Sequence, residues 1–142
     1  MRKAVRVNPK SAPQSHAVNV RRGNARASAE AMALDARRAA SALGFGVNEV
    51  RDVLDADAAT AASIHAGEAR IPPGSELAGR TLLLVRLHRA LGDVYGSLDQ
   101  VNAWLDAEEP ALHARPRELI RSQAGLRRVV EQVEGRCKDC LW

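Results

Sequence analysis

The stretch SELAGRTLLLVRLHRALGDVYGSLDQVNAWL, residues 75–105, decides the fold class of this chain. Its leucines and valines recur at three- to four-residue spacing across 77–94, which is typical of a long helix buried on more than one side. Gly96 ends that helix, and Ser97, with a glutamine three residues later, forms a capping box that starts the next one. The stretch therefore predicts two consecutive α-helices joined by a tight turn.

Similar start and stop signals predict further helices on both sides of this stretch. Ser28, Asn48 and Asp57 are N-cap candidates, and Gly44 and Gly67 are stop signals. Pro116 suits the first turn of a short helix. The helices expected beyond the two above cover residues 28–43, 49–55, 58–66, 116–120 and 123–134, and a short tail follows from residue 135.

Composition agrees with an all-α fold. The 142 residues include 26 alanines but only four aromatic residues, which favours close helix packing over a β-sandwich or barrel core. No apolar run approaches the ~18 residues of a membrane span, and the basic N-terminus lacks the apolar region of a secretory signal. Two cysteines are too few for a disulfide scaffold. We therefore expect a cytoplasmic protein that has no membrane partner.

Positive charge is concentrated at the N-terminus. Residues 1–26 hold seven of the 21 Lys and Arg residues and no acidic residue, so the remaining chain has 14 basic against 17 acidic residues. Two prolines and little apolar content predict that residues 1–27 form a disordered basic arm. Two interpretations stay open: an arm that touches nucleic acid or an acidic partner, and a solubilising leader.

Residues 47–66 fit a helix-turn-helix, with a turn near Asp57 between two short helices. The second helix has no Arg, Lys, Asn or Gln to read base edges, so the pattern indicates the fold more strongly than it indicates DNA reading. Dimerisation is the alternative role of this unit. The candidate DNA-binding residues are Thr60, Ser63, His65 and Arg70, together with Arg21 and Arg22 of the arm.

Nothing in the sequence points to an enzyme. The four histidines are scattered, and no catalytic triad, phosphate-binding glycine loop or carboxylate pair can be assembled. Cys137 and Cys140 have CxxC spacing but lack the further ligands of a zinc site, so two ordinary thiols are favoured over a redox dithiol. Asp106, Glu108 and Glu109 read as a solvated acidic turn. We predict no metal, no cofactor and no catalytic residue.

The C-terminal part of the chain carries a recognisable order of residues. An aromatic residue and a glycine end a helix, Trp-Leu follows in the next helix, and then come Pro-x-Leu, Pro-x-Glu-Leu and a glycine before the last helix. This order resembles the toxin-binding domain of the Xre/MbcA/ParS antitoxin family, the partners of RES-domain toxins. The matching residues are Tyr95, Gly96, Trp104, Leu105, Pro110, Leu112, Pro116, Glu118, Leu119 and Gly125.

The resemblance covers about residues 29–142 and departs from the family pattern at two places. His113 and Ala114 stand where glycines are common, and Asp139 occupies about the place of a C-terminal glycine. The implied organisation is a disordered basic arm (1–27), an Xre-like helix-turn-helix or dimerisation unit (28–74), and a small helical toxin-binding domain with a C-terminal tail (75–142).

The resemblance implies a type II antitoxin that binds a RES-domain toxin, which consumes NAD or transfers ADP-ribose, and that occludes the toxin's NAD site. The implied toxin-binding residues are Tyr95, Trp104, Arg136, Lys138, Leu141 and Trp142. It also implies a homodimer through the Xre-like unit within a toxin–antitoxin hetero-oligomer, with operator DNA and autorepression as a second role. A stand-alone helix-turn-helix transcription regulator is the alternative.

Overall fold

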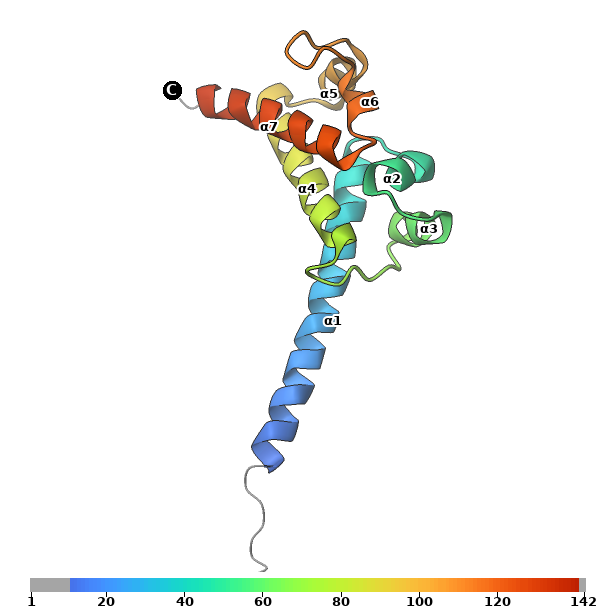
Figure 1. Cartoon of the computed structure of the whole chain (residues 1–142), viewed down its shortest axis with the longest axis vertical. Coiled ribbons are helices and arrows are strands. Elements are labelled where there is room, and N and C mark those ends of the chain that lie inside the picture. The colour runs from blue at the N-terminus through green and yellow to red at the C-terminus, as the bar shows by residue number, and fades with distance from the viewer. Residues whose placement is uncertain (1–10, 141–142) are drawn as a thin grey trace, which may run out of the picture.

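The computed structural model describes the backbone of residues 11–140 and the side chains of residues 26–136. This part of the chain folds into seven helices without a strand, which confirms the all-α class (Figure 1). None of its helices is long and apolar enough to cross a membrane. The helices are α1 (Ser11–Ala42), α2 (Val47–Leu54), α3 (Ala58–Ala66), α4 (Glu76–Tyr95), α5 (Leu98–Asp106), α6 (Pro116–Leu119) and α7 (Gln123–Cys140).

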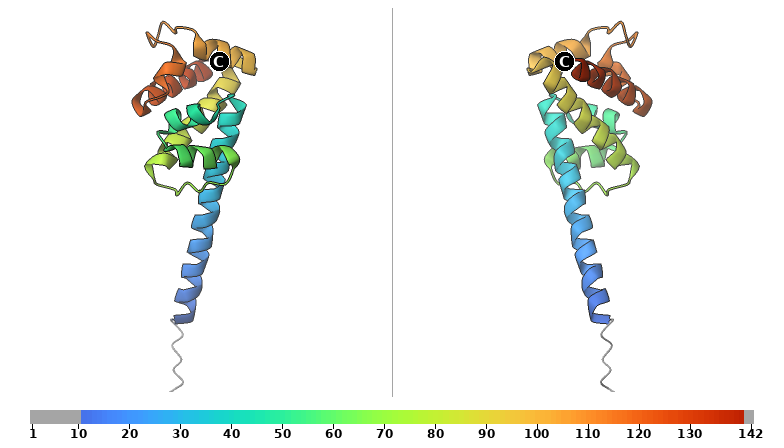
Figure 2. Two further views of the ribbon diagram at one scale, coloured as in Figure 1. Left: turned by 90° about the vertical axis from the view of Figure 1, so that its right-hand side faces the viewer. Right: turned by 90° about the vertical axis from the view of Figure 1, so that its left-hand side faces the viewer.

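Helix α1 begins 17 residues before the predicted start at Ser28, so the prediction of a disordered arm is wrong for residues 11–27. Pro13 lies in the first turn, where a proline removes no helical hydrogen bond, and no proline follows before Pro72. Figures 1 and 2 show the N-terminal half of α1 extending away from the other helices. The part of the predicted arm before Ser11 lies outside the described residues.

One hydrophobic core holds the helices together. Helix α4 packs between α1 and α7, α3 packs against α1, and α2 contacts α3, α4 and α7 (Figure 1). Helix α1 contributes mainly alanines to this core and α4 contributes leucines, and small residues allow two helix axes to approach closely. The buried alanines of α1 are 29, 33, 36, 39 and 40, and the fully buried leucines of α4 are 84, 87 and 91. The core is continuous across the expected boundary between residues 74 and 75.

Local capping fixes most helix boundaries where the sequence predicts them. Asp57 accepts a hydrogen bond from the Thr60 N–H at 2.7 Å and starts α3, and Gly67 ends it with a φ of 80°. Hydrogen bonds from the backbone and side chain of Thr60 lower the pKa of Asp57, which keeps the capping carboxylate charged. Ser97 caps α5 through the Gln100 N–H at 3.3 Å. These three positions confirm the predictions.

Two other boundaries differ from the prediction. Helix α2 begins at Val47, because the carbonyl of Gly46 already accepts the first helical hydrogen bond from the Val50 N–H, so Asn48 is not its cap. Helix α7 does not end near Glu134 but continues through Gly135 to Cys140. A single glycine inside a helix costs only about 1 kcal/mol relative to alanine, which a well-packed helix tolerates. Most of the predicted tail is therefore helical.

Among the described residues, the core contains a buried hydroxyl without a hydrogen-bond partner, which gives a stability prediction. Thr81 is fully buried on α4, and its Oγ1 makes no hydrogen bond. We expect Thr81→Val to stabilise the fold by about 1 kcal/mol, because a methyl group replaces a buried hydroxyl that has lost its water. Urea unfolding measures the change. Thr81→Ser is the matched control: it keeps the hydroxyl, removes the methyl group and should destabilise. A Val variant less stable than the wild type would contradict the prediction.

Candidate functional site

Four side chains from distant parts of the chain meet at the C-terminal end of α4; we call them the Trp104 cluster. The indole Nε1 of Trp104 donates to Glu109 Oε2 at 3.0 Å. Arg136 on α7 donates to Glu109 Oε1 at 2.7 Å and to the Tyr95 hydroxyl at 2.6 Å. The guanidinium lies 5.7 Å from the centroid of the Trp104 ring, and the Tyr95 and Trp104 rings lie 5.9 Å apart. The cluster joins α4, α5, the loop after α5 and α7.

The polar contacts of the Trp104 cluster are partly buried. The Glu109 side chain is only 12% exposed and that of Arg136 is 34% exposed, so their ion pair is partly shielded from water. Burial raises the pKa of Tyr95, and the nearby charge of Arg136 only partly opposes this change, so Tyr95 is a neutral hydroxyl near pH 7. The cluster therefore fixes the direction in which α7 extends beyond Glu134.

Three of the predicted toxin-binding residues, Tyr95, Trp104 and Arg136, lie together in the structure. They contact one another and Glu109. Trp104 is 9% exposed and belongs to the core. Glu109 was interpreted as solvated, whereas it is the acceptor at the centre of the cluster. No local pattern could have revealed it, since Arg136 is 27 residues away. The side chains of Lys138, Leu141 and Trp142, like those of Cys137 and Cys140, lie outside the described residues.

Arg117 on α6 forms a second junction. It donates to Asp106 at 2.5 Å, to Glu49 of α2 at 2.7 Å and to Asn102 at 3.1 Å, and it lies 5.9 Å from the centroid of the Phe45 ring. Burial alone would lower its pKa, but hydrogen bonds and charges from Asp106 and then Glu49 outweigh burial and raise it. Asp106 therefore forms an ion pair with Arg117, whereas the sequence pattern indicated only a solvated acidic turn.

Glu49 belongs to a row of acids on α2 and its C-cap residue, which we call the α2 acid row. Glu49, Asp52 and Asp55 recur every three residues, and each faces an arginine from the chain beyond residue 75. The pairs are Glu49–Arg117 at 2.7 Å, Asp52–Arg121 at 3.9 Å and Asp55–Arg80 at 3.4 Å. The first short helix of the candidate helix-turn-helix is therefore attached to the C-terminal unit through charge pairs as well as through the core.

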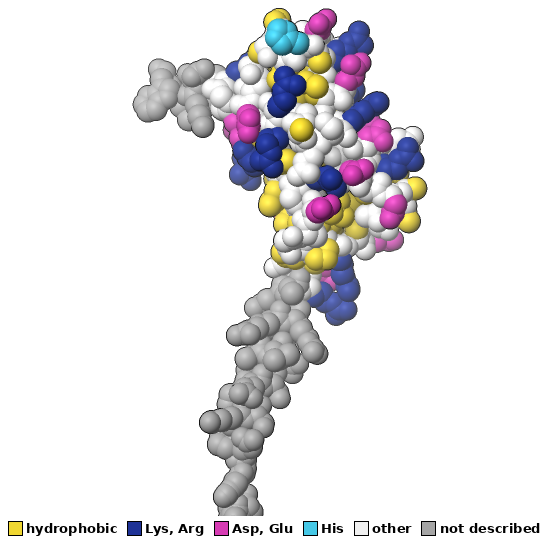
Figure 3. All heavy atoms as spheres, viewed as in Figure 1, with side chains coloured by type: hydrophobic (Ala, Val, Ile, Leu, Met, Phe, Trp, Pro, Cys, Tyr) yellow, Lys and Arg dark blue, Asp and Glu magenta, His cyan; other side chains and the backbone are white. Residues whose placement is uncertain are grey.

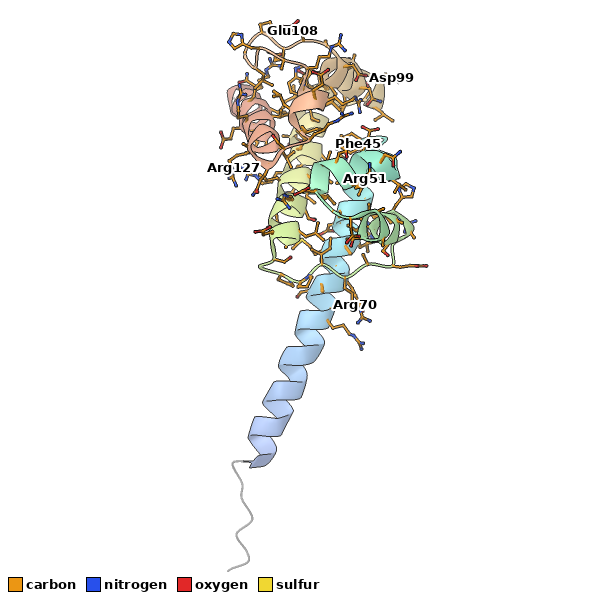
Figure 4. All side chains as sticks on the ribbon, turned by 45° about the vertical axis from the view of Figure 1, so that its right-hand side comes forward. Phe45, Arg51, Arg70, Asp99, Glu108 and Arg127 are labelled. Atoms are coloured by element: carbon orange, nitrogen blue, oxygen red, sulfur yellow. The ribbon has the colours of Figure 1, made fainter. Side chains whose placement is uncertain are left out.

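The candidate DNA-binding side chains that the structure describes do not share one surface. Thr60 and Ser63 are half-buried, and His65 lies on another face of α3, since the helix turns about 100° per residue. Arg70 pairs with Glu30 of α1 at 3.5 Å and lies beside α1, at the end of the body away from Glu108 (Figure 4). Side chains of Arg21 and Arg22 lie outside the described residues. Figure 3 shows basic and acidic side chains interspersed over the described part of the face that is seen in Figure 1.

Gly125, one of the family-pattern residues, lies where α7 approaches the end of α6. A Cβ atom at this position would overlap the carbonyl oxygen of Leu119, and its third close neighbour would be Ser122 Oγ at 2.9 Å. The Gly125 N–H donates to the same Ser122 Oγ at 3.0 Å. Only glycine therefore allows the first turn of α7 to lie against the backbone of α6.

Comparison with known proteins shows which family and which solved structure this chain is similar to. Residues 90–135 match the family described as the antitoxin Xre/MbcA/ParS C-terminal toxin-binding domain. The fold is similar to a chain of the crystal structure of the M. tuberculosis MbcT–MbcA toxin–antitoxin complex, with a TM-score of 0.58 and 27% sequence identity over 75% of this chain and 94% of that chain. No curated protein sequence matches.

The matched range contains Tyr95, Trp104 and Glu109 of the Trp104 cluster. It also contains the whole of α5 and α6 and the close approach of Gly125 to Leu119. Antitoxins of this family are a non-enzymatic class, as the sequence predicted. Residues 90–135 of this chain thus match the C-terminal toxin-binding domain of the Xre/MbcA/ParS antitoxin family.

Proposed function

We propose that this chain is a cytoplasmic antitoxin that binds and neutralises a RES-domain toxin, which consumes NAD or transfers ADP-ribose, by covering the toxin's NAD site. The match of residues 90–135 to the toxin-binding domain carries the proposal. The fold similarity to a chain of a toxin–antitoxin complex supports it over a longer part of the sequence.

The Trp104 cluster suggests how occlusion is achieved. Arg136 is bound to Glu109 and Tyr95, so its role is to hold the end of α7 in place and not to enter the toxin. The residues that reach the NAD site are then the ones that follow it, Lys138, Leu141 and Trp142. Lysine supplies a positive charge there, and leucine and tryptophan supply apolar anchors of the kind that dominate binding energy in protein interfaces.

Truncation tests this proposal if the cut preserves Arg136. We expect a chain ending at Arg136 to fold normally but to leave the toxin active, because it keeps the bonds to Tyr95 and Glu109 and loses residues 137–142, which include the three assigned to the NAD site. Growth and cellular NAD are measured during co-expression with a RES-domain toxin encoded by an adjacent gene. Circular dichroism checks the fold.

A chain ending at Gly135 is the matched comparison, since it also removes the two hydrogen bonds of Arg136. If the chain ending at Arg136 protects cells as well as the full chain, occlusion by the C-terminal residues is wrong. If the full chain neither protects cells nor binds the toxin, the antitoxin proposal itself fails, and the stand-alone regulator becomes the better interpretation.

We infer a second role, operon autorepression by a homodimer, from the geometry of α2 and α3. These helices have 8 and 9 residues and are joined by a three-residue connection, which fits a helix-turn-helix. The α2 acid row favours this role as well, because paired carboxylates repel DNA phosphates less than unpaired ones. Two copies of the unit would then contact two half-sites.

We expect specific binding to promoter DNA that weakens steeply with salt, because the base-reading helix is poor in polar groups and phosphate contacts must supply most of the affinity. A gel-shift titration at several salt concentrations, with and without the toxin, measures this. Deletion of residues 1–26 should flatten the salt dependence. Strong specific binding by a chain that has no toxin partner would favour the stand-alone regulator.

A further inference from the structure

A small hollow lies between the C-terminal end of α1, the last turns of α4 and the start of α5. Its volume is about 150 Å³. A hollow of that size in another protein interior holds one benzene molecule, so this one has room for a single bulky apolar side chain. Eight residues line it: Ala42, Leu43, His88, Gly92, Gly96, Ser97, Leu98 and Val101.

The hollow exists because two glycines of this region carry no side chain. Gly92 and Gly96 lie one helical turn apart, and a Cβ built on either meets no atom within 4 Å. Leu98 stands at the rim and is 46% exposed, although most large apolar side chains of the described residues are buried. An open hollow beside an exposed leucine is a surface that a partner can cover.

A second, shallower hollow of 450 Å³ continues this surface along α1. Ala42 lines both hollows, so the two adjoin. Leu34, 37% exposed, provides the apolar part of the second hollow, and Arg37 and Arg38 flank it. Neither set of lining residues contains a carboxylate, whereas Arg37 and Arg38 carry positive charge. The complementary partner surface is an apolar side chain next to acidic groups.

We propose that this surface, the Gly92 hollow and its extension along α1, is a second docking point for the toxin. It receives one bulky apolar side chain of the toxin, and carboxylates beside that side chain face Arg37 and Arg38. This rests on the proposed function. The toxin is the occupant because five of the eight residues that line the hollow lie within residues 90–135, the range that matches the toxin-binding domain.

The open space at Gly92 allows the hollow to be filled without strain. Gly92→Leu places its side chain where no atom lies within 4 Å, and leucine is a better helix former than glycine, so the variant should unfold at the same temperature as the wild type or higher. Its affinity for a catalytically inactive form of the adjacent-gene toxin should fall at least tenfold. Titration calorimetry and thermal unfolding measure the two effects.

Gly79→Leu is the matched control, since Gly79 lies on the same helix, is exposed and also has open space at its Cβ position, but does not line the hollow. It should bind the toxin like the wild type. Arg38→Glu should weaken binding several-fold, most at low salt, whereas Arg127→Glu on α7, outside both hollows, should not.

Wild-type affinity of Gly92→Leu overturns the docking point, and so does an equal loss of affinity in both glycine variants. A change in self-association without a change in toxin affinity, seen by light scattering, assigns the surface to a second copy of the chain and also overturns it. Absence of any binding by the wild-type chain is a different result, because it overturns the proposed function.

Discussion

Gly125→Ala is expected to destabilise the fold by at least about 3 kcal/mol, the upper range for overpacking a filled site. The added methyl group would overlap the backbone carbonyl oxygen of Leu119, which cannot move aside like the end of a flexible side chain. Helices α6 and α7 would have to separate, which would open the core around Ile120 and Leu126. Urea unfolding of purified protein measures the loss.

Gly135→Ala is the control for this effect, because Gly135 lies on the same helix and a Cβ there meets nothing within 4 Å. It should stabilise the protein by up to about 1 kcal/mol through helix propensity. Opposite signs for the two changes in stability would show that lack of space at Gly125, and not the helix propensity of glycine, makes its alanine substitution destabilising. A Gly125→Ala variant as stable as the wild type would disprove the close approach.

Arg136→Met is expected to cost about 2–3 kcal/mol and to abolish toxin neutralisation. Removal of one partner of a buried ion pair typically costs about 3–5 kcal/mol, and the partial exposure of Arg136 reduces this value. The Glu109 carboxylate would remain beside Trp104 without its cation, and α7 would lose its bond to Tyr95. Chemical unfolding and cell growth during co-expression with the toxin measure the two effects.

A double-mutant cycle with Glu109→Gln separates charge from packing. Glutamine keeps a hydrogen-bond acceptor for Trp104 but carries no charge, so the double variant should recover about 1–2 kcal/mol relative to additive losses. If the double variant regains stability but still fails to neutralise the toxin, the direction of α7 is what the toxin requires. Strictly additive losses would mean that Glu109 and Arg136 do not interact.

Elements bounded by local capping were predictable from the sequence. Helix α3 begins after Asp57 and ends before Gly67 because each boundary depends on residues within one turn of it. The predicted helices were shorter than α1 and α7. The polar composition of the arm and Gly135 indicated helix ends, but neither ends a helix where no proline or capping residue is present.

The site was predictable only in part, for a related reason. Tyr95 and Trp104 could be nominated from their order along the chain, but the contacts that define the cluster join residues 27 and 41 positions apart. Glu109 has the same local surroundings as its solvated neighbour Glu108, so nothing within a few residues distinguishes them. Long-range pairing of charges requires the fold before it can be identified.

The α2 acid row affects where this chain can be divided if one of its parts is replaced by a part of another protein. A chimaera that joined residues 75–142 to an unrelated DNA-binding unit would carry Arg80, Arg117 and Arg121 without the acids that face them, and it would also expose part of the shared core. A chimaera whose breakpoint keeps α2 together with residues 75–142 should therefore be more stable than one joined at residue 74, because it retains these ion pairs and this part of the core.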